Sequence, residues 1–403
     1  MTRAMRCAAV VCFASLLSWG GAATAADPIK IGILVPVNHV VGRAQLNSAK
    51  MAVDEINAQG GVMGRKLQLL VEDTQINPEK AIAGYRKLAT SDRVAAVVGI
   101  YSSGVTLAVQ EHMARYKVPL IGTASASIAL TNRVKESPDK YKYYFRMMIN
   151  ELREADAMGD YVANYLKPTL KLKRVGIMVE NAKWVEQLMP RLREKIKNAG
   201  LEIAAEESFD VKTTDFSPIF ASLTSKKVDF IVEVSAIADG VVYVKQWHDL
   251  QGPPIGVCNV NAMDGDFWEK TGGKSLTEST FYLGAYAVPI TSKTLGYWNG
   301  YQKLYGSAPN YPGGFTYDAI YVLASAMRAA KTTEPDPLVA AIEKVNVVGA
   351  TGNVAFQPDH DIQYGKKGDP TVLFVQWQKN GDRKILYPPE FADGKYLKPA
   401  WIK

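Results

Sequence analysis

The chain contains 403 residues, of which 22% are charged and 47% are apolar. These proportions are typical of a soluble globular protein and exclude a disordered chain or a multi-span membrane protein. The length predicts two or more domains, each large enough to form its own hydrophobic core. Only three cysteines and four histidines are present, and the histidines lie far apart in the sequence. We therefore expect no disulfide scaffold, no metal site and no cofactor.

Residues 1–26 have the features of a secretory signal peptide. Two arginines precede an apolar stretch at residues 8–19, and small residues follow at 22–26. An uncleaved membrane anchor is the alternative, but Gly20 and Gly21 end the apolar stretch short of the ~20 residues that span a bilayer. Cleavage removes two of the 47 basic residues and none of the 40 acidic ones, which lowers the formal net charge from +7 to +5. This mild charge, without aromatic side chains interleaved among basic ones, argues against a nucleic-acid partner.

Strands and helices alternate along the rest of the chain. The first run has strands at residues 30–37, 66–72, 94–100 and 118–122, with helices at 44–58, from 77 and at 104–116. The second run has helices at residues 153–166, 184–199, from 217 and at 240–250, with strands at 174–179, 201–208, 228–234 and 255–260. Apolar strands separated by helices predict parallel sheets with helices on both faces. Because no flexible linker separates the two runs, we expect two α/β lobes with a structured hinge.

The end of the chain has a different pattern. Residues 371–378 and 384–387 read as strands, and the dipeptide Asn380-Gly381 lies between them. An Asn-Gly pair between two apolar runs is a strong turn signal. We therefore predict a β-hairpin here. We also predict that the helix at 184–199 is kinked at Pro190, because an interior proline removes a helical hydrogen bond.

Two turns at the ends of predicted strands are rich in small hydroxyl side chains. In an open α/β sheet, ligands bind at the carboxyl ends of the strands. A turn that enters a helix there presents free N–H groups and hydroxyls, which suit a carboxylate or another anion. Ordinary helix capping by these serines is the alternative. The candidate residues are Tyr101, Ser102 and Ser103 in the first turn, Ala124, Ser125 and Ser127 in the second, and Asn38 and His39 after the first strand, where simple loop packing is the alternative for His39.

Six short segments carry a resemblance to a known family. They are Ile31–Pro36, Ala52–Arg65, Val98–Gly99, Tyr144–Arg146, Tyr317–Ala319 and Val375–Trp377. Their order and spacing, over essentially the whole mature chain, resemble the type I periplasmic solute-binding proteins of the branched-chain amino-acid (leucine/isoleucine/valine-binding) ABC transporter family.

The resemblance implies two Rossmann-like lobes with parallel central sheets, joined by a hinge of three chain crossings. It divides the chain into an N-terminal lobe of residues 27–146 and 286–355 and a C-terminal lobe of residues 147–285 and 356–403. It also implies a periplasmic protein whose lobes close over a small ligand and then dock on the permease and ATPase complex of an ABC transporter. We expect a monomer.

The same resemblance implies roles for particular residues. In that family a serine of the first turn, and hydroxyl and amide groups of the second, hold the ligand carboxylate; these fall on Ser103, with Ser102 beside it, and on residues 124–127. An aromatic side chain of the second lobe that covers the ligand falls on Trp184. A threonine of the second turn in the amino-acid binders falls on Ala126, so Ser125 or Ser127 would have to replace it.

Two positions depart from the amino-acid-binding pattern. The family's tyrosine falls on Ala236, and the acid that pairs with the ligand ammonium falls on Asn259. A buried ammonium without a carboxylate is costly, whereas Asn259 and Asn261 suit neutral groups. Ala236 enlarges the pocket, and Trp184 offers an aromatic ring a stacking face that contributes roughly 1 kcal/mol. These departures favour an apolar or aromatic acid without an ammonium group over a branched-chain or other amino acid.

The sequence therefore predicts a binding protein and not an enzyme. Its ligand is expected to be a small carboxylate that is delivered to a transporter. An exported enzyme and a sensor ectodomain are the alternatives from other classes. An enzyme would need a catalytic constellation, and no Gly-x-Ser-x-Gly nucleophile motif occurs in the sequence.

Overall fold

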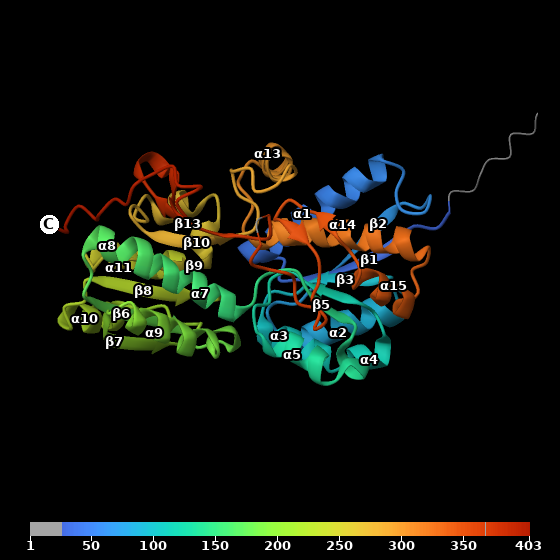
Figure 1. Ribbon diagram of the computed structural model, residues 1–403, viewed down its shortest axis with the longest axis horizontal. Coiled ribbons are helices and arrows are strands. Elements are labelled where there is room, and N and C mark those ends of the chain that lie inside the picture. The colour runs from blue at the N-terminus through green and yellow to red at the C-terminus, as the bar shows by residue number, and fades with distance from the viewer. Residues whose placement is uncertain (1–25, 367) are drawn as a thin grey trace, which may run out of the picture.

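The computed structural model describes residues 26–366 and 368–403 as two α/β lobes that lie side by side along the long axis of the molecule (Figure 1). The predicted signal peptide, apart from Ala26, lies outside the described residues. Among the described helices, none is both long and apolar enough to cross a membrane. The predicted α/β class with two parallel central sheets is confirmed, with two antiparallel strands added to the second sheet.

The first lobe is built on a five-stranded parallel sheet with the order β2-β1-β3-β4-β5. Its strands are β1 (Ile29–Val35), β2 (Leu67–Asp73), β3 (Ala96–Gly99), β4 (Leu120–Gly122) and β5 (Tyr144–Arg146). Its helices are α1 (Val40–Ala58), α2 (Pro78–Thr90), α3 (Ser103–Gln110), α4 (Met113–Tyr116), α5 (Ala129–Glu136), α6 (Pro138–Tyr141), α13 (Thr294–Tyr305), α14 (Pro312–Ala330) and α15 (Pro335–Ile342). Helices α1 and α14 cover one face, and α2, α3 and α5 lie on the other (Figure 1). The central strands are buried on both faces, which explains their continuous apolar sequence.

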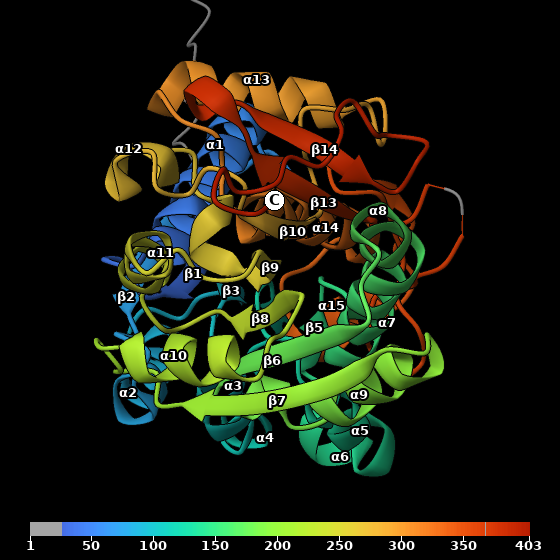
Figure 2. The same ribbon diagram turned by 90° about the vertical axis from the view of Figure 1, so that its left-hand side faces the viewer.

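The second lobe contains a seven-stranded sheet with the order β14-β13-β10-β9-β8-β6-β7, which Figure 2 shows from β14 at the top to β7 at the bottom. Its strands are β6 (Arg174–Glu180), β7 (Glu202–Phe209), β8 (Phe230–Ser235), β9 (Ile255–Asn259), β10 (Ser279–Leu283), β13 (Val372–Trp377) and β14 (Arg383–Tyr387). Helices α7 (Glu151–Tyr161), α8 (Lys167–Leu170) and α9 (Leu188–Asn198) lie on one side, and α10 (Ser217–Ser225), α11 (Gly240–Asp249) and α12 (Phe267–Thr271) on the other (Figure 2). A small hairpin of β11 (Val347–Val348) and β12 (Asn353–Val354) stands apart from both sheets.

Two local predictions have different outcomes. The C-terminal hairpin is confirmed: β13 and β14 pair antiparallel, and Asn380 has a φ of 65° at the turn between them. The single kinked helix at 184–199 is wrong. The chain forms a short 3-10 turn at Lys183–Val185, and α9 begins only at Leu188. Pro190 therefore lies in the first turn of α9, where its missing N–H has no helical partner to lose.

The chain passes between the two lobes three times, as predicted. It leaves the first lobe after β5, returns to it after β10 with helices α13, α14 and α15, and enters the second sheet again at β13. Before this last crossing, residues 356–362 lie against β5: the ring of His360 stacks on Phe145 with centroids 3.9 Å apart, and Arg146 donates to Asp361 at 2.6 Å. The predicted division assigns residues 356–362 to the C-terminal lobe, whereas these contacts join them to the first sheet.

Candidate functional site

A small cavity lies between the two lobes at the carboxyl ends of their strands. Its volume is about 30 Å³, and most of its lining is apolar or aromatic. The lining residues are Tyr101, Ser102, Ser103, Ala124, Ala126 and Tyr311 from the first lobe, and Met148, Glu154, Trp184, Ala236, Ile237, Val260 and Phe281 from the hinge and the second lobe. This volume is about that of one water molecule. A small organic ligand therefore requires the lobes to part or the aromatic side chains to turn.

The first turn enters this cavity because of the way β3 ends. Gly99 has a φ of 119°, and a Cβ added there would lie 2.6 Å from the carbonyl oxygen of Leu34. The chain then turns sharply into α3, with Ser102 as its N-cap. Ser102 makes no capping hydrogen bond with its side chain, and the Oγ of Ser103 accepts one from the N–H of Ser127 at 3.1 Å. The Ser103 hydroxyl proton therefore remains able to donate to an anion at the N-terminal end of α3.

In the second turn, the alanines and not the serines line the cavity. Ala124 and Ala126 face it, whereas the serine side chains that alternate with them point into the lobe. The Oγ of Ser125 lies 2.6 Å from Oγ1 of Thr106 and close to two backbone carbonyl oxygens of the first turn. The Oγ of Ser127 donates to Glu151 at 3.4 Å. The structure thus does not bring these two predicted site residues to the cavity. The Ser125 hydroxyl binds Thr106 and the first turn, and the Ser127 hydroxyl binds Glu151.

The lobes contact each other directly at Tyr101. Its hydroxyl donates to the carbonyl oxygen of Ala236 at 2.6 Å, and both residues line the cavity. Burial raises the pKa of the Tyr101 phenol well above its ordinary value. The phenol is therefore a neutral donor at physiological pH, and this hydrogen bond joins the two lobes beside the cavity.

Trp184 is held in place by a buried carboxyl group. Its indole Nε1 donates to Glu180 at 2.8 Å, and the side chain is 8% exposed. The same carboxyl group accepts hydrogen bonds from the backbone N–H groups of Ile237 and Ala238 at 2.9 and 3.0 Å. Glu180 therefore fixes both the aromatic wall and the turn after β8 that carries Ala236.

The predicted amide groups Asn259 and Asn261 do not line the cavity. Asn259 is fully buried; its Nδ2 donates to Glu278 at 2.5 Å, and its Oδ1 accepts from the N–H of Asn261 at 3.0 Å. The side chain of Asn261 donates to the carbonyl oxygen of Ala238 at 3.1 Å. Both amides thus bind groups of the second lobe itself, and Asn259 caps the 3-10 turn after β9.

Asn38 and His39 line a separate open hollow at the ends of β1 and β2. The Nδ1 of His39 accepts from the N–H of Val41 at 3.3 Å and caps α1. Burial lowers the pKa of His39 to about 4, so the ring is neutral at physiological pH. Its centroid lies 5.2 Å from that of Tyr101. His39 therefore packs beside Tyr101, which lines the cavity, and does not line the cavity itself.

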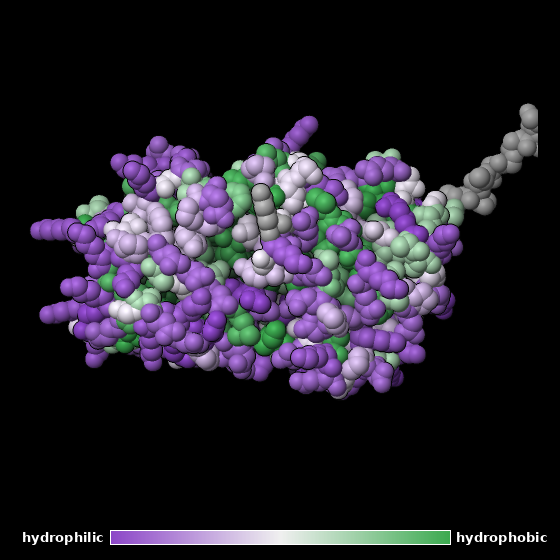
Figure 3. All heavy atoms as spheres, viewed as in Figure 1, coloured by the Kyte–Doolittle hydropathy of each residue, from purple (hydrophilic) through white to green (hydrophobic). Residues whose placement is uncertain are grey.

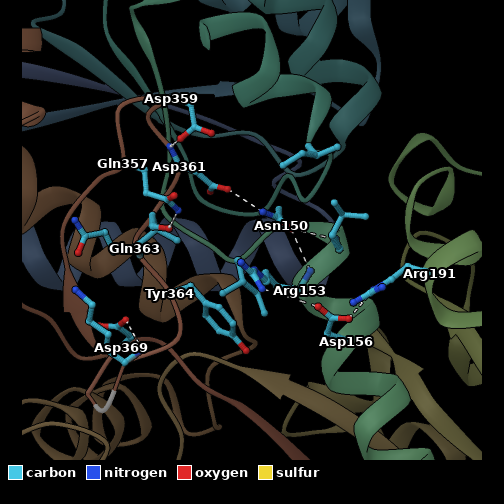
Figure 4. A pocket seen from close by; sticks show the side chains of 15 residues that line it. Asn150, Arg153, Asp156, Arg191, Gln357, Asp359, Asp361, Gln363, Tyr364 and Asp369 are labelled. Carbon is cyan, nitrogen blue, oxygen red and sulfur yellow. Dashed lines mark hydrogen bonds and ion pairs between the residues drawn. The ribbon is translucent and has the colours of Figure 1, made fainter. Parts of the chain in front are cut away.

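A much larger hollow of about 710 Å³ opens beside the hinge, between the start of α7 and residues 357–366 with Asp369 (Figure 4). Several of its polar side chains already bind one another. Arg191 donates to Asp156 at 2.8 Å, and Asn150 donates to Asp361 at 2.9 Å. No residue predicted for the site lies on this hollow. On the face seen in Figure 3, hydrophilic side chains are spread over both lobes, and no single patch gathers them.

The sequence did not indicate several residues of the cavity. Met148, Phe281 and Tyr311 supply much of its apolar wall, and the hydroxyl of Tyr311 donates to the carbonyl oxygen of Ala124 at 3.4 Å. Glu154 adds a buried carboxyl group that is 3% exposed. As an acid in the first turn of a helix it has an ordinary sequence context. Nothing in the sequence pattern therefore distinguished it from a solvent-exposed residue.

The comparisons with known sequences all point to one protein family. The model of the periplasmic binding protein family matches residues 28–382. The Leu/Ile/Val-binding protein homolog 8 of Brucella abortus is 25% identical over 386 residues, which cover 91% of this chain and 92% of the relative. The Leu/Ile/Val-binding protein homolog 7 of Brucella suis is 25% identical over 394 residues, which cover 92% and 94%.

Solved structures share the fold over almost the whole chain. The branched-chain amino acid transporter substrate binding protein LivJ of Streptococcus pneumoniae, in complex with isoleucine, has a TM-score of 0.76 at 23% identity and covers 92% of this chain and 100% of its own. A solute binding protein of an ABC transporter from R. palustris, in complex with benzoate, has a TM-score of 0.75 at 16% identity and covers 93% and 98%. The predicted resemblance is confirmed: the chain belongs to the periplasmic binding protein family and is similar to its leucine/isoleucine/valine-binding members.

Proposed function

We propose that this protein is the exported solute-binding component of an ABC transporter, which captures a small carboxylate with an apolar or aromatic body. It works in the periplasm as a monomer and delivers the ligand to the permease and ATPase complex. The observation that carries this proposal is the cavity between the lobes. Its wall combines the first residues of α3, including the Ser103 hydroxyl, with an apolar and aromatic lining from both lobes.

The arrangement of donors supports a carboxylate. The Ser103 hydroxyl and the N-terminal end of α3 face the cavity together, and the helix dipole favours negative charge there. The opposite wall contains Trp184, Val260 and Phe281, which suit an apolar or aromatic group. The ligand therefore binds with its carboxylate toward the first lobe and its body toward the second.

Ligand binding is coupled to closure of the lobes. The hydrogen bond from Tyr101 to the Ala236 carbonyl oxygen joins the lobes in the closed form. A ligand that contacts both walls gains interactions only when the lobes are closed, and this difference shifts the population toward the closed form. The closed form is then the one that the permease recognises.

The sequence favours an acid without an ammonium group over an amino acid. One reason for this preference is the space left by the small side chain of Ala236, and Ala236 does line the cavity. The other reason is that the amide of Asn259 stands where the family has an acid. In the structure this amide binds Glu278 away from the cavity. The solved relatives hold either kind of molecule: one is in complex with isoleucine and the other with benzoate. The proposed function therefore covers both, with the carboxylate and the apolar body as the shared features.

The test starts from protein purified without denaturation. Mass spectrometry of any small molecule released from it identifies the natural ligand, and calorimetry then measures the affinity for that molecule and for a panel of apolar and aromatic carboxylates. We expect at least one carboxylate to bind with 1:1 stoichiometry and to be recovered unchanged. Failure of every carboxylate to bind would overturn the proposal, and conversion of a bound ligand into a product would place the protein among enzymes.

A further inference from the structure

Two fully buried carboxyl groups, Glu233 of β8 and Glu278 just before β10, lie beside each other inside the second lobe. Neither oxygen of Glu233, nor Oε2 of Glu278, receives a hydrogen bond from an N–H or hydroxyl donor of residues 26–366 and 368–403. The phenol oxygen of Tyr243 on α11 lies beside Glu233, is also fully buried and lacks a partner in the same part of the chain. No basic side chain of the described chain is among the groups that shift the pKa of either acid. The two acids are therefore buried together without a counterion.

These two carboxyl groups hold at least one proton between them. Burial raises the pKa of both, and the charge of Glu233 raises that of Glu278 further. A protonated carboxyl group can donate to an ionised one, whereas two ionised groups repel each other strongly where water does not screen them. Tyr243 of α11 and Cys258 of β9 are the other titratable groups whose charge interacts with Glu233, and burial keeps both of them neutral. The pair is therefore stable in this arrangement only while it holds a proton.

Glu278 fixes the amide that follows β9. Its Oε1 accepts from Nδ2 of Asn259 at 2.5 Å. The Oδ1 of Asn259 in turn accepts from the N–H groups of Asn261 and Ala262 at 3.0 and 3.3 Å and caps the 3-10 turn Val260–Met263. An amide that is held at its nitrogen has a fixed orientation, and the position of the cap follows from it. The acid pair thus determines where this turn begins.

The capped turn reaches both the ligand cavity and the first lobe. Val260 lines the cavity, and its carbonyl oxygen accepts from Nδ2 of Asn310 in the first lobe at 3.3 Å. The Oδ1 of Asn310 accepts from the N–H of Tyr311, another cavity residue, at 2.9 Å. An unbroken series of contacts therefore leads from the acid pair through Asn259 to the cavity wall and to a contact between the lobes.

Packing alone does not account for two acids at this place. Apolar side chains of similar size would fill the same space without the loss of hydration that a buried charge suffers. The backbone beside Glu233 is also strained, because its partner in β9, Val257, has a φ of 108°, which a β-branched residue rarely adopts. Unfavourable features of this kind concentrate at functional sites.

We propose that Glu233 and Glu278 are positioning residues of the ligand site, whose shared proton keeps Asn259 and the turn Val260–Met263 in the arrangement of the closed cavity. This inference rests on the proposed function, because the turn lines the proposed ligand cavity. When the pH rises and the proton is lost, two adjacent negative charges drive the carboxyl groups apart, and Asn259 loses its acceptor. The closed form is then destabilised relative to the open form, and ligand affinity falls.

Calorimetry as a function of pH tests the proposal on the full mature protein. The probes are isoleucine, leucine, phenylalanine, benzoate and 3-phenylpropanoate, and the tightest binder is followed from pH 6 to pH 9, within the range in which tryptophan fluorescence shows a folded protein. Glu278→Gln removes the charge but keeps an oxygen that can accept from Asn259, and Glu278→Ala removes that acceptor as well. The matched control is Glu207→Gln, which changes a partly buried acid of the same lobe that accepts from Ser222 and does not line the cavity.

We expect the unmodified protein to bind at least about 5-fold more weakly at pH 9 than at pH 6, since a pKa that differs by one unit between the closed and open forms changes affinity about 10-fold. The sign follows from the raised pKa: the contribution is present at low pH and is lost as the pH rises. Burial raises the pKa of Glu154, which lines the cavity, to about 8 as well, so the comparison between proteins decides. Glu278→Gln should lose most of the pH dependence, Glu207→Gln should keep it, and Glu278→Ala should bind more weakly at every pH.

An affinity of the unmodified protein that does not change with pH overturns the proposal and leaves the proposed function intact. A fall of unchanged size in Glu278→Gln also overturns it, because the acid pair is then not the source of the pH dependence. Equal affinities of Glu278→Gln and Glu278→Ala at pH 6 overturn the connection through Asn259. If no probe, and no carboxylate released from the purified protein, binds at any pH, the proposed function fails as well.

Discussion

The buried ion pair between Arg146 and Asp361 should dominate the stability of the hinge. Asp361 accepts hydrogen bonds from Nε and Nη2 of Arg146 at 2.8 and 2.6 Å and from Asn150 at 2.9 Å, and the Arg146 side chain is fully buried. Changing Asp361→Ala removes both carboxyl oxygens, and with them all three hydrogen bonds, and leaves a guanidinium inside the protein without a counterion. Loss of one partner of a buried pair typically costs about 3–5 kcal/mol. We expect a decrease of this size in the free energy of unfolding.

Urea denaturation followed by tryptophan fluorescence measures this loss. The matched control is Glu206→Gln, which removes the partner of Arg193 in a surface ion pair and should cost less than about 1 kcal/mol. A second comparison replaces both partners with apolar residues, Arg146→Met with Asp361→Leu. That double variant should recover much of the lost stability because no unpaired charge remains. The reasoning would be refuted by an Asp361→Ala variant that unfolds within about 1 kcal/mol of the unmodified protein.

Three further predictions concern the cavity and the second lobe. Glu180→Gln should weaken ligand binding about 10-fold without changing stoichiometry, because a neutral amide holds Trp184 less firmly; calorimetry showing unchanged affinity would contradict this. Tyr101→Phe removes the hydrogen bond to Ala236 and should lower ligand affinity about 5-fold. X-ray scattering of the ligand-bound variant should also show a larger radius of gyration. Scattering and affinity identical to those of the unmodified protein would contradict this prediction. Burial raises the pKa of Glu233 to about 8 from its ordinary 4.5, so the contribution of this group to stability is fully present below pH 4.5 and is lost as the pH rises toward 8. Glu233→Gln should flatten this loss in urea titrations between pH 5 and pH 8.

The sequence predicted the elements that depend on local pattern. Buried strands read as continuous apolar runs, and the turns after β3 and β4 were placed at the ends of the correct strands. Six of the twelve candidate residues line the cavity between the lobes; they are Tyr101, Ser102, Ser103, Ala124, Trp184 and Ala236. These positions follow from strand ends and family spacing, which fix where the backbone goes.

These patterns do not predict the direction in which a side chain points. In the second turn, hydroxyl chemistry favoured Ser125 and Ser127, but the backbone turns the neighbouring alanines toward the cavity. The serine hydroxyls instead satisfy buried groups on other parts of the chain, such as Thr106 and Glu151. A hydrogen bond between residues about 20 positions apart leaves no trace in local spacing, and such contacts decide which residues face the cavity.

The contrast between Asn259 and Glu154 has a more general consequence for inferring a ligand from sequence. In the family pattern, the acid that pairs with a ligand ammonium group falls on Asn259, and the sequence shows no other candidate for that role. In the structure, Asn259 binds Glu278 inside the second lobe, so its amide gives no information about the ligand. The requirement for a negative charge belongs to the cavity as a whole, because Coulomb attraction in a buried site depends on distance and solvation and not on the strand that supplies the carboxyl group. Glu154 is a buried carboxyl group that lines the cavity from helix α7. A missing acid at the expected position therefore argues for a ligand without an ammonium group only when no other buried carboxyl group lines the cavity, and here one does.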